Sequence, residues 1–197
     1  MDLAVALVNK IRGKDINAPL LDPGVPGLTP AFTMNAAQKA QEKKNLDLLE
    51  PSTAAFVKSI LIWSRANGIN ALLGETYRSA EAQGKIDPSK TAITPGKIGW
   101  HQVGRAFHLM VADENGQLAK DYFKDPKIKT SYQTIGAEVR RRGGEWLGDR
   151  VTHGPGGDFV DLAHFEYHPG LVLWQYRKSP LATREVTQAE KRAARYS

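Results

Sequence analysis

Hydrophobic residues recur along this chain with two different periods. In residues 51–67 they fall on one stripe at helical spacing, which predicts a helix that packs against a sheet. In residues 100–112 and 161–168, apolar and polar positions alternate, as they do along a half-buried strand. Helices packed against a small, mostly antiparallel sheet make an α+β domain, and this is the fold class that we expect.

Shorter patterns complete the expected architecture. Further helices are predicted at residues 2–12, 35–45, 79–84 and 132–142, a strand at 69–77, and a turn or short strand at 145–149. Two polar, glycine-containing loops, 85–99 and 151–158, precede the strands at 100–112 and 159–167, and the first is expected to form the rim or lid of a site. We expect residues 1–45 to form an N-terminal helix and extended arm, residues 46–176 the main domain, and residues 177–197 a basic tail, as a surface helix or a frayed end.

The chain is basic and contains no cysteine. Its net charge of +6 and its pI of about 9.5 favour an acidic partner, such as nucleic acid, an anionic membrane, or a bacterial wall rich in carboxylates and phosphates. No run interleaves basic with aromatic residues, so we do not expect a nucleic-acid platform. The lack of cysteine excludes disulfides, thiolate zinc ligands and a cysteine nucleophile.

Four of the five histidines lie in the two alternating segments. His108 shares a strand face with Ala106 and Met110, whereas His164 shares one with Glu166 and His168. Because imidazole is the commonest protein ligand for zinc, two such strands predict a metal site assembled across a sheet. The alternative is a pair of buried strands whose histidines are only hydrogen-bonded.

Four motifs resemble those of one enzyme family, in the same order. Residues 101–108 read HQVGRAFH and resemble the pattern H-x-x-G-x-A-x-D, and residues 161–166 read DLAHFE and resemble D/E-x-x-H. Residues 74–79 read GETYRS, with Gln83 following, and residues 144–149 read GEWLGD. These motifs are similar to those of the zinc D-Ala-D-Ala carboxypeptidase and L-Ala-D-Glu endopeptidase family, which includes phage endolysins. The resemblance covers about residues 45–175 and implies the α+β fold of that family.

The resemblance implies a Zn²⁺ site whose protein ligands are His101, His108 and His164. The family has Asp where this chain has His108, and it usually has Ser where this chain has Gly99. Three outcomes are open for His108. It can complete a three-histidine zinc site, it can mark a site whose metal is lost or weakened, or it can be a change that damages an otherwise ordinary enzyme.

The resemblance also implies the catalytic groups. Asp161 occupies the position of the general base, and Arg78 that of a residue which faces the substrate and neutralises charge on its carbonyl or carboxylate. Gln83 matches a glutamine that orients the peptide. Asp161 lies three residues before His164, so their side chains share a site only if the chain bends between them.

Other polar residues near the motifs are expected to play supporting roles. Glu166 and Asp149 could each hold a ligand imidazole from behind, and Trp146 could form part of the scaffold or a wall of the cleft. His153 could reach the metal if His108 does not, and His168 is expected to pack or to lie on the surface.

Together these features predict a zinc peptidase that cuts a peptide bond in the stem peptides of bacterial peptidoglycan. The alternative is a wall-binding module of the same fold without a competent metal. Residues 3–8 are too short for the core of a signal peptide, and no segment is long enough to span a membrane. We therefore expect the chain to be made in the cytoplasm and to act on the wall after release or as part of a phage particle. We also expect it to be a monomer.

Overall fold

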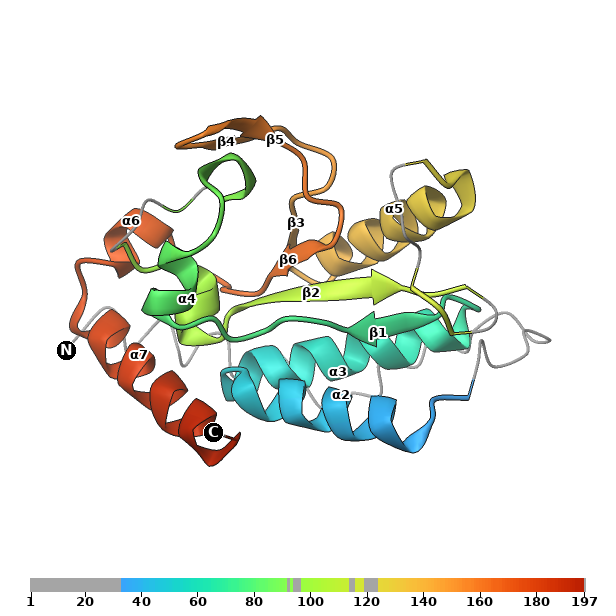
Figure 1. The fold of residues 1–197 in the computed structure, drawn as a ribbon, viewed down its shortest axis with the longest axis horizontal. Helices are drawn as coiled ribbons and strands as arrows, with labels where there is room; N and C mark the ends of the chain where they lie inside the picture. Colours follow the sequence, from blue (N-terminus) through green and yellow to red (C-terminus); the bar gives the residue numbers. More distant parts are fainter. Residues whose placement is uncertain (1–32, 92, 94–96, 114–115, 119–123, 197) are drawn as a thin grey trace.

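A computed structural model describes residues 33–91, 93, 97–113, 116–118 and 124–196, and these residues form the expected α+β fold (Figure 1). The main sheet has four antiparallel strands in the order β1-β2-β6-β3, and a separate hairpin is made of β4 and β5. The strands are β1 Ala71–Leu73, β2 Ala106–Val111, β3 Glu145–Trp146, β4 Thr152–Gly154, β5 Gly157–Phe159 and β6 His164–Glu166. The helices are α2 Ala36–Leu48, α3 Pro51–Ala66, α4 Ala80–Gly84, α5 Pro126–Arg141, α6 Leu173–Tyr176 and α7 Pro180–Ala193, with 3-10 helices η1 Pro88–Lys90, η2 Trp100–Val103 and η3 Ala194–Tyr196.

Strand β2 separates the core from the functional face of the sheet. Its side chains Phe107, Leu109 and Val111 are buried against apolar residues of α3 and α5. His108 points from the opposite face of the same strand and is only partly buried. The alternation in the sequence therefore predicted the two faces of β2 correctly.

The main helices begin where side chains satisfy the free N–H groups of their first turns. Glu50 caps α3 by accepting hydrogen bonds from the N–H groups of Ser52 and Thr53. Asp125 caps α5 in the same way, and Pro126 occupies its first position. The helix predicted at 132–142 therefore begins six residues earlier than expected.

Several predicted strands are shorter than expected or interrupted. Residues 100–112 are not one strand, because η2 comes first and ends at Gly104, whose φ is +73°. A Cβ at Gly104 would lie 2.8 Å from the backbone nitrogen of Glu50, so this turn needs glycine in both conformation and space. The strand predicted at 69–77 is limited to β1, and residues 159–167 divide between β5 and β6. The loop predicted at 151–158 is largely the β4–β5 hairpin, and the loop at 85–99 contains η1.

The C-terminal segment forms an ordered helix that is anchored by a buried ion pair. Glu185 in α7 accepts two hydrogen bonds of 2.8 Å from Arg105, at the start of β2, and one of 2.7 Å from the hydroxyl of Tyr176. These contacts tie α7 to the turn that carries His101. The predicted division into 1–45, 46–176 and 177–197 stays a prediction, and the helix expected at residues 2–12 lies outside the described residues.

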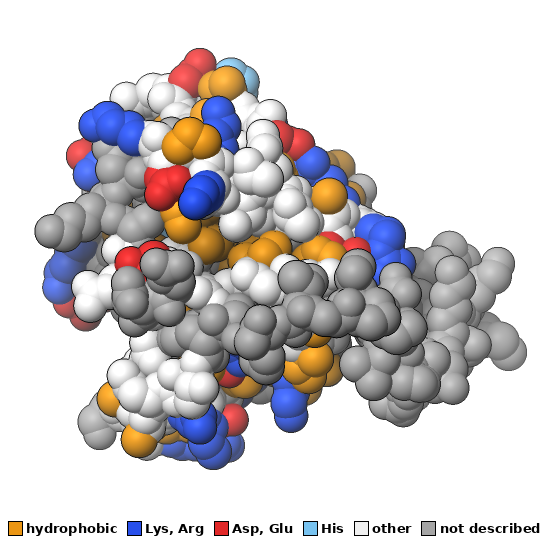
Figure 2. All heavy atoms as spheres, turned by 90° about the vertical axis from the view of Figure 1, so that its right-hand side faces the viewer, with side chains coloured by type: hydrophobic (Ala, Val, Ile, Leu, Met, Phe, Trp, Pro, Cys, Tyr) orange, Lys and Arg blue, Asp and Glu red, His pale blue; other side chains and the backbone are white. Residues whose placement is uncertain are grey.

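The described surface carries both signs of charge. On the face shown in Figure 2, Lys and Arg side chains form separate small groups with Asp and Glu among them. Among the helices of the described residues, none combines the length and apolar character needed to cross a membrane.

Candidate metal centre

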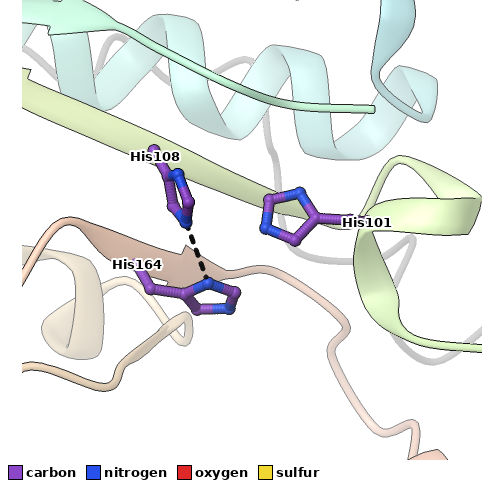
Figure 3. A group of neighbouring side chains, drawn as sticks. All are labelled: His101, His108 and His164. Atoms are coloured by element: carbon purple, nitrogen blue, oxygen red, sulfur yellow. Dashed lines mark hydrogen bonds between the residues drawn. The ribbon is translucent and has the colours of Figure 1, made fainter. Parts of the chain in front are cut away.

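Three histidines converge on one point (Figure 3). The ring centroids of His101, His108 and His164 form a nearly equilateral triangle, with sides of 5.0, 5.1 and 5.2 Å. One ligand atom from each ring lies within 4.8 Å of those of the other two. The structure thus brings together all three residues that the sequence predicted as metal ligands.

Two of these histidines are a cross-strand pair. His108 in β2 lies directly opposite His164 in β6, and Nε2 of the first is 3.2 Å from Nδ1 of the second. Two nitrogens that bind one tetrahedral zinc at about 2.05 Å are roughly 3.3 Å apart. His101 enters from η2 rather than from a strand, which corrects the expectation of two ligand-bearing strands.

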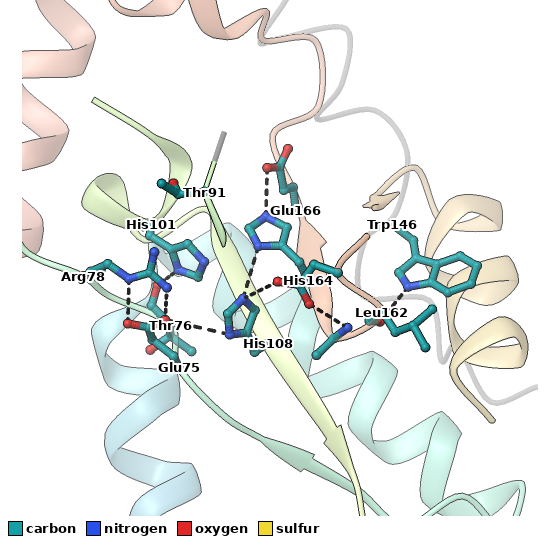
Figure 4. Close-up of polar contacts among 12 residues, drawn as sticks. Glu75, Thr76, Arg78, Thr91, His101, His108, Trp146, Leu162, His164 and Glu166 are labelled. Carbon is teal, nitrogen blue, oxygen red and sulfur yellow. Dashed lines mark hydrogen bonds and ion pairs between the residues drawn. The ribbon is translucent and has the colours of Figure 1, made fainter. Parts of the chain in front are cut away.

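Each imidazole turns its other nitrogen toward an oxygen (Figure 4). Nδ1 of His101 donates to the carbonyl of Thr76 at 2.8 Å, and Nε2 of His164 donates to Glu166 at 3.0 Å. Nδ1 of His108 lies 3.8 Å from the carboxylate of Glu75. Such partners set the orientation and tautomer of metal-binding histidines and raise their basicity.

The centre is prepared for a cation by the protonation state of its rings. Burial, together with the other imidazoles, lowers the pKa of His101 well below its ordinary value, and burial and His164 lower the pKa of His108 to about 4. Both rings are therefore neutral near pH 7 and keep a lone pair. Nε2 of His101 is buried and has no hydrogen-bond partner among the described residues. An orphaned lone pair that faces two more imidazoles fits a zinc ion.

Asp161 lies beside this centre because the chain bends before β6. Its Oδ1 accepts a hydrogen bond of 3.0 Å from the N–H of Ala163, which closes a turn at Leu162 and Ala163. Its other oxygen, Oδ2, lies 3.6 Å from Nε2 of His108. The bend that the spacing from His164 required is therefore present.

Arg78 and Gln83 form a connected polar network on the opposite wall. Arg78 donates to both oxygens of Glu75, with 2.8 Å from Nε to Oε1, and its Nη1 donates to Oε1 of Gln83 at 3.0 Å. Gln83 is buried, and its Nε2 donates to Oγ1 of Thr91 at 2.8 Å. Glu75 therefore contacts both Arg78 and His108, and links the wall to the metal centre.

A cavity of about 410 Å³ opens over these groups. The three histidines, Asp161 and Glu166 line it, and so do Arg78, Gln83 and the apolar side chains of Trp100, Leu147, Phe159 and Leu173. This volume lies at the small end of the range for ligand sites, about 300–1,000 Å³. The cavity therefore combines a polar, metal-competent floor with partly apolar walls.

The remaining histidines and acids divide into near and remote groups. His153 is exposed, pairs with Asp158 at 2.7 Å, and does not line the cavity. His168 stacks on Trp100, and its Nε2 lies 2.9 Å from Glu166. It therefore helps to hold the carboxylate that accepts the hydrogen bond from His164. Asp149 pairs with Arg140 rather than with a ligand imidazole, which corrects its expected role.

Trp146 is part of the core, as expected of a scaffold residue. It is buried, and its Nε1 donates to the carbonyl of Leu162 at 2.8 Å, which holds the turn before β6. Sequence reasoning missed Glu75, Thr76 and Thr91, although Glu75 and Thr76 lie inside the motif that contains Arg78. An acidic residue three positions before a motif arginine was the available signal.

The thermal stability of the metal-free chain should fall as the pH drops from 6.5 toward 5. The pKa values of His101 and His108 lie below 6.5 in the folded chain, so in this window the unfolded chain binds more protons. Stability therefore rises with pH here, by at most about 1.4 kcal/mol per buried imidazole and pH unit. Melting temperatures of chelator-treated protein across this range measure the effect. His108→Gln should flatten the slope, and a constant melting temperature in the unaltered chain would contradict buried neutral imidazoles.

Replacing Glu166 by Gln should weaken zinc binding by about 10- to 100-fold. Burial alone would raise the pKa of Glu166, but hydrogen bonds from His164 and His168 outweigh it and lower the pKa to about 2. Glu166 is therefore an anion behind His164, and a neutral amide removes that charge. Competition with a chromophoric chelator gives the dissociation constant. Asp158→Asn, which alters an exposed His–Asp pair outside the cavity, is the control, and equal affinities for both variants would refute the role of Glu166.

Comparisons with known proteins found one relative in sequence and one neighbour in fold. No family model matches the chain. Over 128 residues, it is 29% identical to the L-alanyl-D-glutamate peptidase of Listeria phage A118, a match that covers 63% of this chain and 40% of that protein. The chain thus spans less than half the length of this relative. The crystal structure of ChiX, the L-Ala D-Glu endopeptidase of Serratia marcescens, has the same fold, with a TM-score of 0.50 and 20% identity over 70% of this chain and 91% of that one. The sequence match confirms the predicted resemblance to the D-Ala-D-Ala carboxypeptidase and L-Ala-D-Glu endopeptidase family, and the structural match confirms the predicted α+β fold.

Proposed function

We propose that this chain is a zinc-dependent peptidase that hydrolyses a peptide bond in the stem peptides of bacterial peptidoglycan. The convergence of three imidazole nitrogens beside a carboxylate is the observation that carries this proposal. The similarity to two L-Ala-D-Glu peptidases supports the substrate class and favours cleavage between L-Ala and D-Glu over removal of a terminal residue.

His101, His108 and His164 would hold the zinc through the nitrogens that face one another. When bound, zinc would polarise the scissile carbonyl and acidify the attacking water. Asp161 is suited to take up the proton of that water, because only one of its oxygens is engaged by the backbone. It then returns the proton to the amine of the leaving peptide.

Arg78 binds the substrate in this proposal. Its bonds to Glu75 and Gln83 use three of the five N–H groups of a guanidinium, and the other two remain for a carbonyl or carboxylate in the cavity. Glu75 and Gln83 hold the guanidinium of Arg78 in place. Gln83 would therefore orient the peptide indirectly, by positioning Arg78, and directly, because it lines the cavity.

The setting that we propose is a phage-encoded enzyme that degrades the wall during lysis or as part of the particle, and that acts as a monomer. The similarity to a phage peptidase supports the first part of this proposal. The basic net charge would attract the chain to an acidic wall. The alternative is a wall-binding module without hydrolytic activity, which the histidine at the second ligand position had favoured.

Mass spectrometry of products from purified wall fragments tests the proposed function. Zinc-loaded protein should release fragments with a new N-terminal D-Glu, and a chelator should stop this release until zinc is restored. Sedimentation with insoluble walls is measured in parallel. Co-sedimentation without any released fragment would replace the peptidase by the binding module.

A further inference from the structure

Two segments that the sequence placed in separate loops meet above the cavity. The N–H of Gly156, in the turn of the β4–β5 hairpin, donates to the carbonyl of Pro88 in η1 at 3.1 Å. Figure 1 shows the hairpin and the loop that carries η1 side by side at one end of the molecule. We call this contact, between residues 88–91 and 154–157, the roof bridge.

The roof bridge depends on two glycines that allow close backbone contact. A Cβ at Gly156 would overlap with the backbone of Pro88 and Ser89, and one at Gly154 would overlap with the carbonyl of Thr91. Neither glycine has a positive φ, so space rather than backbone conformation requires glycine here. The same methyl group at Gly84 would have no atom within 4 Å.

The roof bridge lies over the reactive groups and is held to them. Asp87, Lys90 and Thr91 line the cavity from the η1 side, and Thr152 and Phe159 line it from the hairpin. Thr91 also accepts the hydrogen bond from Gln83, whose carbonyl holds Arg78. One chain of hydrogen bonds therefore runs from the roof to the wall of the metal centre.

A covered cavity restricts which peptides can reach its floor. A stem peptide with a free end can slide beneath the roof bridge, whereas a peptide joined to a second stem carries a bulky group at both ends. The cavity has a volume of about 410 Å³, and the contact between Gly156 and Pro88 limits the width of a peptide that can lie between the roof and the cavity floor. We infer that the roof bridge is a specificity-determining element that selects stem peptides with a free end over cross-linked ones. This inference rests on the proposed function.

Gly156→Ala tests the inference, with Gly84→Ala as the matched control. Un-cross-linked muropeptides and cross-linked dimers from one wall preparation are the two substrates, and kcat/KM is measured for each with zinc-loaded protein. The unaltered chain and Gly84→Ala should prefer the un-cross-linked peptide by about tenfold or more, since pockets discriminate by steric fit on this scale. Gly156→Ala should push the roof apart and bring the ratio close to one, mainly by lowering KM for the dimer.

Folding and zinc content separate a specific effect from damage. Both variants should bind zinc as the unaltered chain does and should melt cooperatively. Gly154→Ala disrupts the same bridge at the end of β4. It replaces Gly156→Ala in the experiment if that variant fails to fold. An unchanged substrate ratio in a folded, zinc-loaded bridge variant would overturn the inference and leave the proposed function intact. If the unaltered chain hydrolysed neither substrate, both the inference and the proposed function would be contradicted.

Discussion

Zinc binding and hydrolysis are expected to disappear together when His108 is replaced by alanine. This residue supplies one of the three nitrogens at the centre, and its Nε2 lies 3.2 Å from Nδ1 of His164 on the paired strand. Two imidazoles cannot hold the ion as three do, so zinc content should fall far below stoichiometric. We expect kcat/KM to fall by about 10⁴-fold or more, because the metal contributes several kcal/mol of charge stabilisation. Elemental analysis and product release measure the two effects.

His108→Asp is the informative companion variant. It restores the carboxylate ligand of the family that this chain resembles, so it should bind zinc and hydrolyse the substrate. A charged ligand leaves less positive charge on the ion, and the rising limb of the pH–rate profile should therefore move to higher pH. His153→Ala, which removes an exposed histidine remote from the cavity, is the control. Full zinc content in His108→Ala would show that His108 is not a ligand.

Three carboxylates lie close to the imidazole rings of the candidate metal centre. The carboxylates of Glu75, Glu166 and Asp161 lie near the rings, at 3.8, 3.0 and 3.6 Å from imidazole nitrogens. The family carries one acidic group on the metal itself, whereas here Glu75 stands behind the imidazole that replaces it. In the proposed zinc site, Glu75 thus supplies behind His108 the negative charge that the carboxylate ligand of the family would carry. We regard this as the physical reason why an Asp-to-His difference is compatible with a metal site.

The motif resemblance predicted that His101, His108 and His164 belong to one site, and the structure brings them together. The alternation of apolar and polar residues predicted the two faces of β2, because those faces depend on local periodicity. Alternation of side chains along a strand places His108 opposite Phe107 and Leu109 in any antiparallel sheet. The spacing between Asp161 and His164 required a bend, and the structure has a turn there. Chemistry carried by residues of one strand or one turn leaves a local signal.

Contacts between distant segments left no such signal. The roof bridge joins residues 88 and 156, and the ion pair that anchors α7 joins Arg105 to a residue 80 positions away. The 3-10 helix that carries His101 ends at Gly104, and the backbone of residues 48–50 packs closely against this glycine. This too is a contact between segments that are far apart in the sequence. Hydrophobic periodicity reports which side of an element is buried but not which element covers it. The roof over the cavity was therefore the least predictable part of the site.

Asp161→Asn should lower kcat by about 10²- to 10⁴-fold while zinc content stays unchanged. Asparagine keeps an oxygen that can accept the N–H of Ala163, so the turn before β6 should persist. Its amide nitrogen cannot take up a proton, and the attacking water then loses its base. Zinc analysis, melting temperature and single-turnover product release distinguish this result from loss of the metal or of the fold. Asp158→Asn, at the exposed pair with His153, should retain full activity. Turnover by Asp161→Asn at the rate of the unaltered chain would remove Asp161 from the mechanism.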